Sequence, residues 1–171
     1  MKLNHQNIEI IRSEKRKKTI QAKEIHGKVY VYLPADLSEE EEKKWIDKIL
    51  RSMEKRKRKR ELNTDGALVE RAQKINEKYF DGKLKFQIKY VTNQNSRFGS
   101  CTPQDKTIRI SDRLANTPSW VRDYVIIHEL AHLIHPNHSR RFWDLVNHYR
   151  YTERAKGYLI AIGMNDDEKV K

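Results

Sequence analysis

The chain of 171 residues carries 36 Lys and Arg against 24 Asp and Glu, which gives a formal net charge of +12, and 37% of its residues are hydrophobic. This length and composition fit one domain, or one domain with a small appendage, and the charge favours phosphate-bearing or acidic partners without identifying one. Cys101 is the only cysteine, and neither a signal peptide nor an apolar run of about 18 residues is present, so we expect a cytoplasmic protein without disulfides or membrane spans.

The first third of the chain predicts a small antiparallel sheet followed by a helix. Short segments rich in β-branched or aromatic residues occur at 8–12, 19–25 and 28–33. His26-Gly27 lies between the last two and suits a tight hairpin turn. Ser38, followed by four glutamates, is typical of a helix start, and this helix runs into KRKRKR at 55–60. We assign residues 1–62 to this β segment and its basic helix.

Residues 63–171 predict the larger part of an α+β protein, a metal-dependent hydrolase domain with a small sheet. In chain order we expect a helix capped by Asn63 or Thr64 and ended by Asp81-Gly82, strands at 84–91 and 107–111, and three helices that begin at Pro118, at His138 or Ser139, and near residue 152. The first of these three helices has the sequence SWVRDYVIIHELAHLIH, and we expect it to continue to Pro136.

This helix contains the motif HExxH, as His128-Glu129-Leu130-Ala131-His132. Residues four apart on a helix lie on nearly the same face, so both imidazoles can share one zinc ion. Glu129 lies beside them and is placed to take a proton from a metal-bound water. The pattern therefore predicts a zinc-dependent hydrolase, although nickel, cobalt or iron would also suit three imidazoles.

His138 is the predicted third metal ligand. On a helix, His135 would lie about 10.5 Å along the axis from His128, which is too far for both to bind one ion together with His132. Pro136 ends the helix, so the chain can turn and bring His138 back to the metal. The resulting HExxHxxxxxH spacing is that of metzincins, which have glycine where His135 stands. The alternatives are a carboxylate, Asp144 or Glu153, and the histidines His135 and His148.

Three stretches carry a resemblance to a known family: SRFGSC at 96–101, TIRISDRL at 107–114, and YVIIHELAHLIHPNHSRRFWDLV at 124–146. They resemble the YgjP-like metallopeptidase family and, more distantly, the SprT-like and WLM zinc peptidases. The family's usual tryptophan is replaced by Phe98, and residues 12–34 are similar to its basic N-terminal strands. The resemblance implies a zincin-like fold, with His128, His132 and His138 on zinc and Glu129 as general base. It implies no particular substrate.

Other residues are candidates for contact with the substrate. We expect the strand at 107–111 to border the cleft, where an extended peptide can add to its edge by main-chain hydrogen bonds. Hydrolysis also requires a group, besides the metal, that stabilises the oxyanion formed in the transition state. The candidates for that role are Arg97, His148, Tyr149 and Tyr151. The residues that we predict to contact the substrate are Arg97, Arg109 and Tyr149. The residues expected in the core are Cys101, Phe142 and Trp143.

Three functions remain open from the sequence. The first is a zinc metallopeptidase. The second is a nucleoside triphosphate pyrophosphohydrolase that uses the same metal, with Arg97, Lys106 and Arg109 beside the cleft. The third is a nucleic-acid-associated protease or DNA-binding protein, because basic residues are dense at 15–18 and 51–60, although a solvated helix end explains the denser cluster more simply. The sequence does not predict an oligomeric state.

Overall fold

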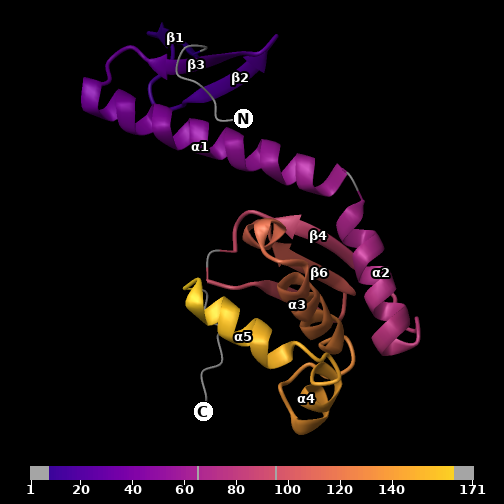
Figure 1. The fold of residues 1–171 in the computed structure, drawn as a ribbon. Helices are drawn as coiled ribbons and strands as arrows, with labels where there is room; N and C mark the ends of the chain where they lie inside the picture. Colours follow the sequence, from indigo (N-terminus) through magenta and orange to yellow (C-terminus); the bar gives the residue numbers. More distant parts are fainter. Residues whose placement is uncertain (1–7, 65, 95, 164–171) are drawn as a thin grey trace. The chain divides into compact units, whose positions relative to one another are not determined.

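The computed structural model describes residues 8–64, 66–94 and 96–163, and the chain divides into two compact units, Met1–Arg58 and Lys59–Lys171. Within these described residues, five α-helices and two three-stranded sheets form a mixed structure (Figure 1). The expected α+β class is confirmed. Each unit contains its own cluster of buried apolar side chains.

The sheet of the first unit contains β1 (Ile8–Ser13), β2 (Gln21–Ile25) and β3 (Lys28–Pro34) in the order β1-β3-β2. A tight turn at His26-Gly27, both with positive φ, joins β2 and β3 as an antiparallel hairpin. β1 pairs with β3 in parallel, so the prediction of a wholly antiparallel sheet is wrong. The strand β3, whose Val29, Val31 and Leu33 are fully buried, takes the central position, so β1 pairs with β3 and not with β2.

Helix α1 (Glu39–Thr64) begins with a reciprocal cap between Ser38 and Glu41. The Ser38 hydroxyl and main-chain N–H donate to the Glu41 carboxylate at 2.9 and 3.1 Å, and Ser38 Oγ accepts from the Glu41 N–H at 3.4 Å. The hydrogen bond from the Ser38 hydroxyl, followed by that from its main chain, lowers the pKa of Glu41. Within the first unit, Leu50 of this helix joins the core of the sheet.

The next helix, α2 (Ala67–Phe80), does not begin where the sequence predicts. Asn63 and Thr64 are the last residues of α1, and the residue that precedes α2 is Gly66, at φ 71°. The Asn63 amide is used elsewhere, since its oxygen accepts from the Tyr90 N–H at 2.8 Å and its nitrogen donates to the Tyr90 carbonyl at 3.1 Å. A tertiary contact thus replaces the predicted cap.

The sheet of the second unit contains β4 (Gln87–Val91), β5 (Gly99–Thr102) and β6 (Thr107–Ser111) in the order β4-β6-β5. β6 is the central strand, parallel to β4 and antiparallel to β5. The 3₁₀ helix η2 (Asp112–Asn116) follows β6. The remaining helices are α3 (Ser119–Ala131), α4 (Arg140–Val146) and α5 (Thr152–Ala161).

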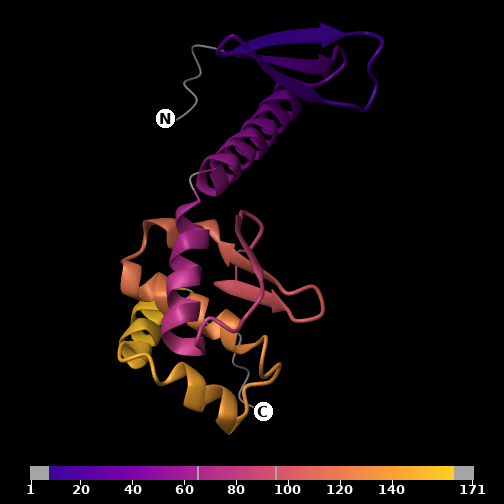
Figure 2. The ribbon, with the colours of Figure 1, turned by 90° about the vertical axis from the view of Figure 1, so that its right-hand side faces the viewer.

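Helix α3 is the central element of this unit. It contacts β5 and β6 of the sheet and also the helices α2, α4 and α5 (Figure 2). Every residue from Asp123 to Ala131 is buried, so its second half is surrounded by the core. A helix packed on all sides has little freedom to shift, and side chains that project from it are held in defined positions.

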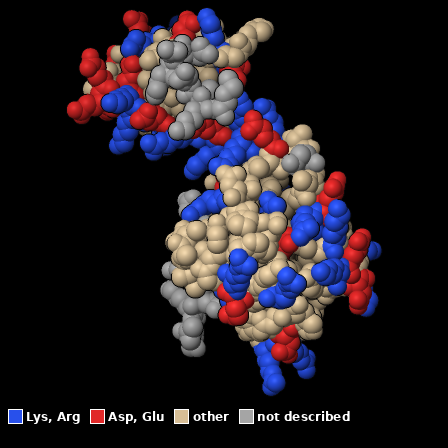
Figure 3. Space-filling view, viewed as in Figure 1, with Lys and Arg blue, Asp and Glu red and all other residues tan. Residues whose placement is uncertain are grey.

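Lys and Arg side chains occur on the face of each unit that is drawn in Figure 3. The face drawn in Figure 3 shows Lys and Arg interrupted by Asp and Glu rather than gathered in one continuous patch. Among the helices that the structure describes, none combines the length and apolar character needed to cross a bilayer.

Candidate metal centre

The second half of α3 places His128 and Glu129 in the buried interior, and His132 follows at the end of the helix. His132 keeps helical geometry, and its N–H donates to the His128 carbonyl at 3.3 Å. The two imidazoles therefore lie one turn apart on the same side, as the HExxH spacing predicts. Their Nε2 atoms are 3.2 Å apart.

His138 approaches from the segment that connects α3 to α4. The α-helix ends at Ala131, earlier than the predicted end near His135, because the chain tightens into turns in which Leu133 and Ile134 donate to the carbonyls three residues before them. This early end lets the chain reverse before Ser139, which precedes α4. His138 Nε2 comes within 3.1 Å of His128 Nε2.

These three histidines fit a metal ion of the zinc type. One ring nitrogen from each lies within 4.8 Å of the others, and no further group of three or more such ligands occurs in the part of the chain that the structure describes. Tetrahedral coordination at about 2.0–2.1 Å would set ligand nitrogens about 3.3–3.4 Å apart, close to the two separations of 3.1 and 3.2 Å from His128. Two of the three separations therefore have the length that a shared ion requires, and the nitrogens of His132 and His138 lie within 4.8 Å of each other.

Burial favours the neutral form, which a metal needs, in two of the three imidazoles, those of His128 and His132. Burial lowers the pKa of His128 well below its ordinary value, and the neighbouring histidines lower it further. Burial also lowers the pKa of His132. The Nδ1–H of His132 is placed to donate to the main-chain oxygen of His135 at 3.2 Å, which leaves the lone pair of Nε2 directed at the cluster.

Aromatic side chains of α4 hold the three rings in place. The fully buried Phe142 contacts His128, His132 and His138, with ring centroids 4.9, 4.5 and 4.7 Å away. Trp143 stacks on His138 at 5.6 Å with an angle of 21° between the ring planes. The prediction that these two aromatics pack α4 against α3 is confirmed. His138 is itself exposed, so its orientation depends on this support.

Glu129 faces the same cavity as the histidines, which has a volume of about 370 Å³. Its side chain lies against β5, where a β-carbon added to Gly99 would be 2.5 Å from Glu129 Oε1. Cys101 also lines the cavity, and burial, together with the charge of Glu129, raises the pKa of its thiol to about 12. At neutral pH this thiol is protonated and is a poor metal ligand or nucleophile.

Residues 6–156 match a family model described as YgjP-like, metallopeptidase domain. The chain belongs to the YgjP-like family. Membership makes it a metallopeptidase, a class of metal-dependent hydrolases. No match was found among curated protein sequences.

Two solved structures have a fold similar to that of this YgjP-like chain. They are the metallopeptidase zymogens abylysin of Pyrococcus abyssi and jannalysin of Methanocaldococcus jannaschii, each with 17% identity and a TM-score of 0.50. Each comparison covers 57% of this chain and 97% of the other. At this identity the likeness concerns the fold alone.

The structure of the YgjP-like chain places the three predicted substrate contacts in different surroundings. Arg97 lines the cavity that holds the histidines. Arg109 is not among its lining residues and donates from its guanidinium to Thr102 Oγ1 at 3.0 Å. Tyr149 lines a different cavity, and its hydroxyl donates to the Trp120 carbonyl at 3.0 Å. The rings or carboxylates of His135, His148, Asp144 and Glu153 are not part of the histidine cluster.

The predicted position of the substrate-binding edge is wrong. β6 (107–111) is paired with a neighbouring strand on both sides, so it has no edge at which a peptide could add. Within the described residues the edge strand beside α3 is β5, and Gly99, Ser100 and Cys101 from it line the cavity.

Sequence reasoning missed two features of this centre. Gly99 leaves room for the Glu129 carboxylate, and the main-chain oxygen of His135 orients His132 although the His135 ring is not part of the cluster. The only signal for Gly99 was its place in the compact stretch RFGSC. A main-chain carbonyl leaves no signal in side-chain identity.

Proposed function

We propose that this YgjP-like metallopeptidase holds one zinc ion on His128, His132 and His138 and uses Glu129 as its general base. The observation that carries the proposal is the convergence of three ring nitrogens beside a buried carboxylate in one open cavity. Three histidine ligands leave a coordination position for substrate, as in catalytic rather than structural zinc sites. When bound, the ion supplies Lewis acidity that polarises the scissile carbonyl and favours ionisation of water.

Glu129 would carry the proton transfers. Its carboxylate accepts a proton from the attacking water and returns it to the nitrogen of the departing amine. The backbone of Gly99 limits where that carboxylate can lie, so the group is positioned before the substrate binds. We assign the hydrolase domain to residues 63–171, since every residue in this mechanism lies in that stretch.

The substrate is proposed to be a peptide that pairs with the outer edge of β5. Such pairing would align the peptide main chain with Gly99, Ser100 and Cys101, which already line the cavity. Arg97 is the one residue of the predicted substrate contacts that we retain, because it lines the cavity and can meet a substrate carbonyl or carboxylate.

The charge around the cavity favours a peptide over a nucleoside triphosphate. Among its described lining residues, Arg97 alone is a Lys or Arg. A triphosphate is normally held by several cations and main-chain N–H groups together. Arg109 and Lys106, which would have completed such a site, are not among the lining residues.

The test compares the wild-type protein with Glu129→Gln and with the matched control Glu77→Gln, an exposed residue of α2. Each purified protein is assayed for zinc content, for cleavage of a peptide library, and for pyrophosphate release from nucleoside triphosphates. We expect Glu129→Gln to keep zinc and to lose about 10²–10⁴-fold in peptide cleavage, while Glu77→Gln matches wild type. Peptide cleavage by Glu129→Gln at the wild-type rate would refute the role of Glu129. Pyrophosphate release without peptide cleavage would refute the substrate.

A further inference from the structure

A second cavity of about 460 Å³ lies in the unit Lys59–Lys171. It is lined by α2, by the start of α3 and by the segment before α5, and it shares no lining residue with the histidine cavity. Helix α3 contributes lining residues to both cavities. Trp120 and Asp123 near its start face this one, and His128 and Glu129 near its end face the metal centre. The two cavities are therefore distinct sites on one rigid helix.

The charge of this cavity selects for anions. Its lining contains four cations, Arg71, Lys74, Lys78 and Arg150, and the single acid Asp123. Asp123 is already neutralised, since Arg71 donates to both of its oxygens, through Nε at 2.7 Å and through Nη2. Three cations are left without a carboxylate in the lining, and an anion in the cavity would meet a net positive field.

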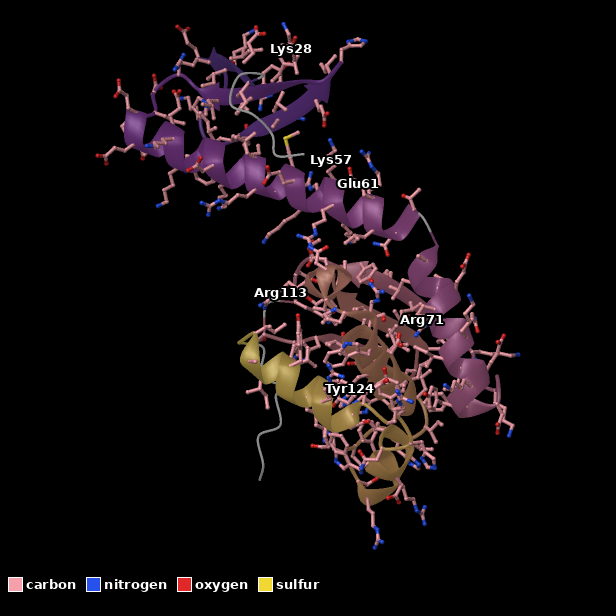
Figure 4. All side chains as sticks on the ribbon, in the orientation of Figure 1. Lys28, Lys57, Glu61, Arg71, Arg113 and Tyr124 are labelled. Carbon is pink, nitrogen blue, oxygen red and sulfur yellow. The ribbon has the colours of Figure 1, made fainter. Side chains whose placement is uncertain are left out.

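Arg71 is well placed to bind such an anion. Its pairing with Asp123 fixes the guanidinium and raises its pKa, so it is always charged. The side chain is nevertheless 45% exposed, and the pairing engages Nε and Nη2, so the donors of Nη1 are left for a ligand. Figure 4 shows Arg71 on the side of α2 that faces α3. A guanidinium fixed in this way loses little freedom when it binds a phosphate.

The walls of the cavity also carry flat aromatic rings. Tyr79, Trp120 and Tyr151 are partly exposed there, and the buried Tyr149 supports two of them through edge contacts at 5.9 Å to Tyr79 and 5.7 Å to Tyr151. The long side chains of Lys78 and Arg150 rest over the rings of Tyr79 and Tyr151 at 5.2 and 4.4 Å. A simple anion would use the cations alone, whereas rings beside cations suit a ligand that joins a planar group to a phosphate.

We propose that this cavity binds a nucleotide unit, with its phosphate at Arg71, Lys74 and Lys78 and its base against Tyr79 or Tyr151. The volume is in the range of ordinary small-ligand sites and fits about one such unit. Two sources offer this chemistry, a free mononucleotide and one residue of a single-stranded nucleic acid. The proposed site uses neither the metal nor Glu129, so its test is independent of the test of the proposed peptidase activity.

The test uses the indole N–H signals of the full-length protein in ¹H–¹⁵N NMR spectra. Trp120 lines the cavity, Trp143 stacks on His138 at the metal centre, and Trp45 lies on α1, so the three signals report on three places. The probes are adenosine 5′-monophosphate, adenosine, inorganic phosphate, a thymidine trinucleotide and an acidic peptide. The variant is Lys74→Glu with Lys78→Glu, and the control of equal charge is Lys85→Glu with Lys89→Glu, exposed residues outside the cavity.

We expect adenosine 5′-monophosphate to shift the Trp120 signal saturably, and to bind at least about tenfold more tightly than adenosine or phosphate alone. The cavity variant should weaken this binding about tenfold or more, and the control should change it by less than about twofold. A trinucleotide that binds more tightly than the mononucleotide identifies a nucleic-acid strand as the source, and equal binding identifies a free nucleotide.

The proposal is overturned by an unchanged Trp120 signal, by a response confined to Trp143, by equal weakening in both variants, or by an acidic peptide that binds as tightly as the nucleotide.

Discussion

Gly99 of β5 and Glu129 of α3 are in such close contact that a β-carbon at position 99 would overlap the Glu129 side chain. A β-carbon at position 99 would lie 2.5 Å from Oε1, 2.9 Å from Cδ and 2.8 Å from Cγ of Glu129. Distances of this size are far inside van der Waals contact, so any larger residue would displace either the carboxylate or the strand. The small residue thus sets the position of the proposed general base.

Replacement of Gly99 by alanine is expected to lower kcat/KM for peptide cleavage by about 10²-fold, because a shift of the base by about 1 Å can cost that much. Zinc content should stay at the wild-type level, since the three atoms nearest to the added methyl group all belong to Glu129 and none to a histidine. The control is Gly157→Ala on α5, where nothing lies within 4 Å of the added carbon. That control should retain activity and gain about 0.5–1 kcal/mol of stability. Wild-type kcat/KM in Gly99→Ala would contradict the positioning role.

Trp143 is expected to support metal binding through His138. The indole stacks on this exposed imidazole, so Trp143→Ala frees the ring to rotate and should weaken zinc affinity about tenfold, within the range found for residues that orient metal ligands. Trp143→Phe keeps a flat ring and should recover most of the loss. Zinc affinity is measured by competition with a chelator at fixed pH. The control is Trp45→Ala, which removes an exposed aromatic residue of α1 and should leave the zinc affinity unchanged. An equal loss of zinc affinity in this control would contradict a specific role of Trp143.

The metal-free protein should lose stability in acid. The pKa values of His128 and His132 are lowered in the folded state, chiefly by burial, whereas both are about 6.5 in the unfolded chain. Below about pH 6.5 the unfolded state therefore binds more protons than the folded state, so the free energy of unfolding falls as the pH is lowered towards the folded-state pKa values. Above that pH these two groups do not make the free energy of unfolding depend on pH.

Urea unfolding in the presence of a chelator, between pH 5 and 8, measures this dependence. Substitution of His128 by phenylalanine should flatten the acid side of the curve, because one buried titrating group is removed. The exposed His26, which has a positive φ that asparagine tolerates, provides the control His26→Asn, and its curve should follow wild type. A stability that is constant from pH 7 to 5 would contradict the prediction.

The ion pair between Arg71 and Asp123 should respond asymmetrically to removal of either partner. The Asp123 side chain is 8% exposed, so Arg71→Ala leaves a buried carboxylate without its partner and should cost about 3 kcal/mol. The Arg71 side chain is 45% exposed, so after Asp123→Ala water can hydrate it and the cost should be about 1 kcal/mol. Urea unfolding of both variants and of the double variant measures the difference. Equal costs would indicate that the pair is better hydrated than its burial suggests.

The sequence by itself determined that His128 and His132 lie on the same face of their helix, because residues one helical turn apart share a face wherever the helix is placed. It also determined that the helix could not pass Pro136, since the proline disfavours helical geometry in the residue before it. From these two local facts the approach of His138 to the other two histidines was predictable, and the structure shows that approach.

The tertiary structure alone decided which groups surround those histidines. The positions of β6 in the centre of its sheet, of Gly99 beside Glu129 and of Tyr149 in the second cavity all depend on contacts between residues far apart in the chain. Asn63 illustrates the same point, since its amide could cap a helix but binds the Tyr90 backbone instead. Local propensities differ by about 1 kcal/mol or less, and the packing of many apolar side chains outweighs them.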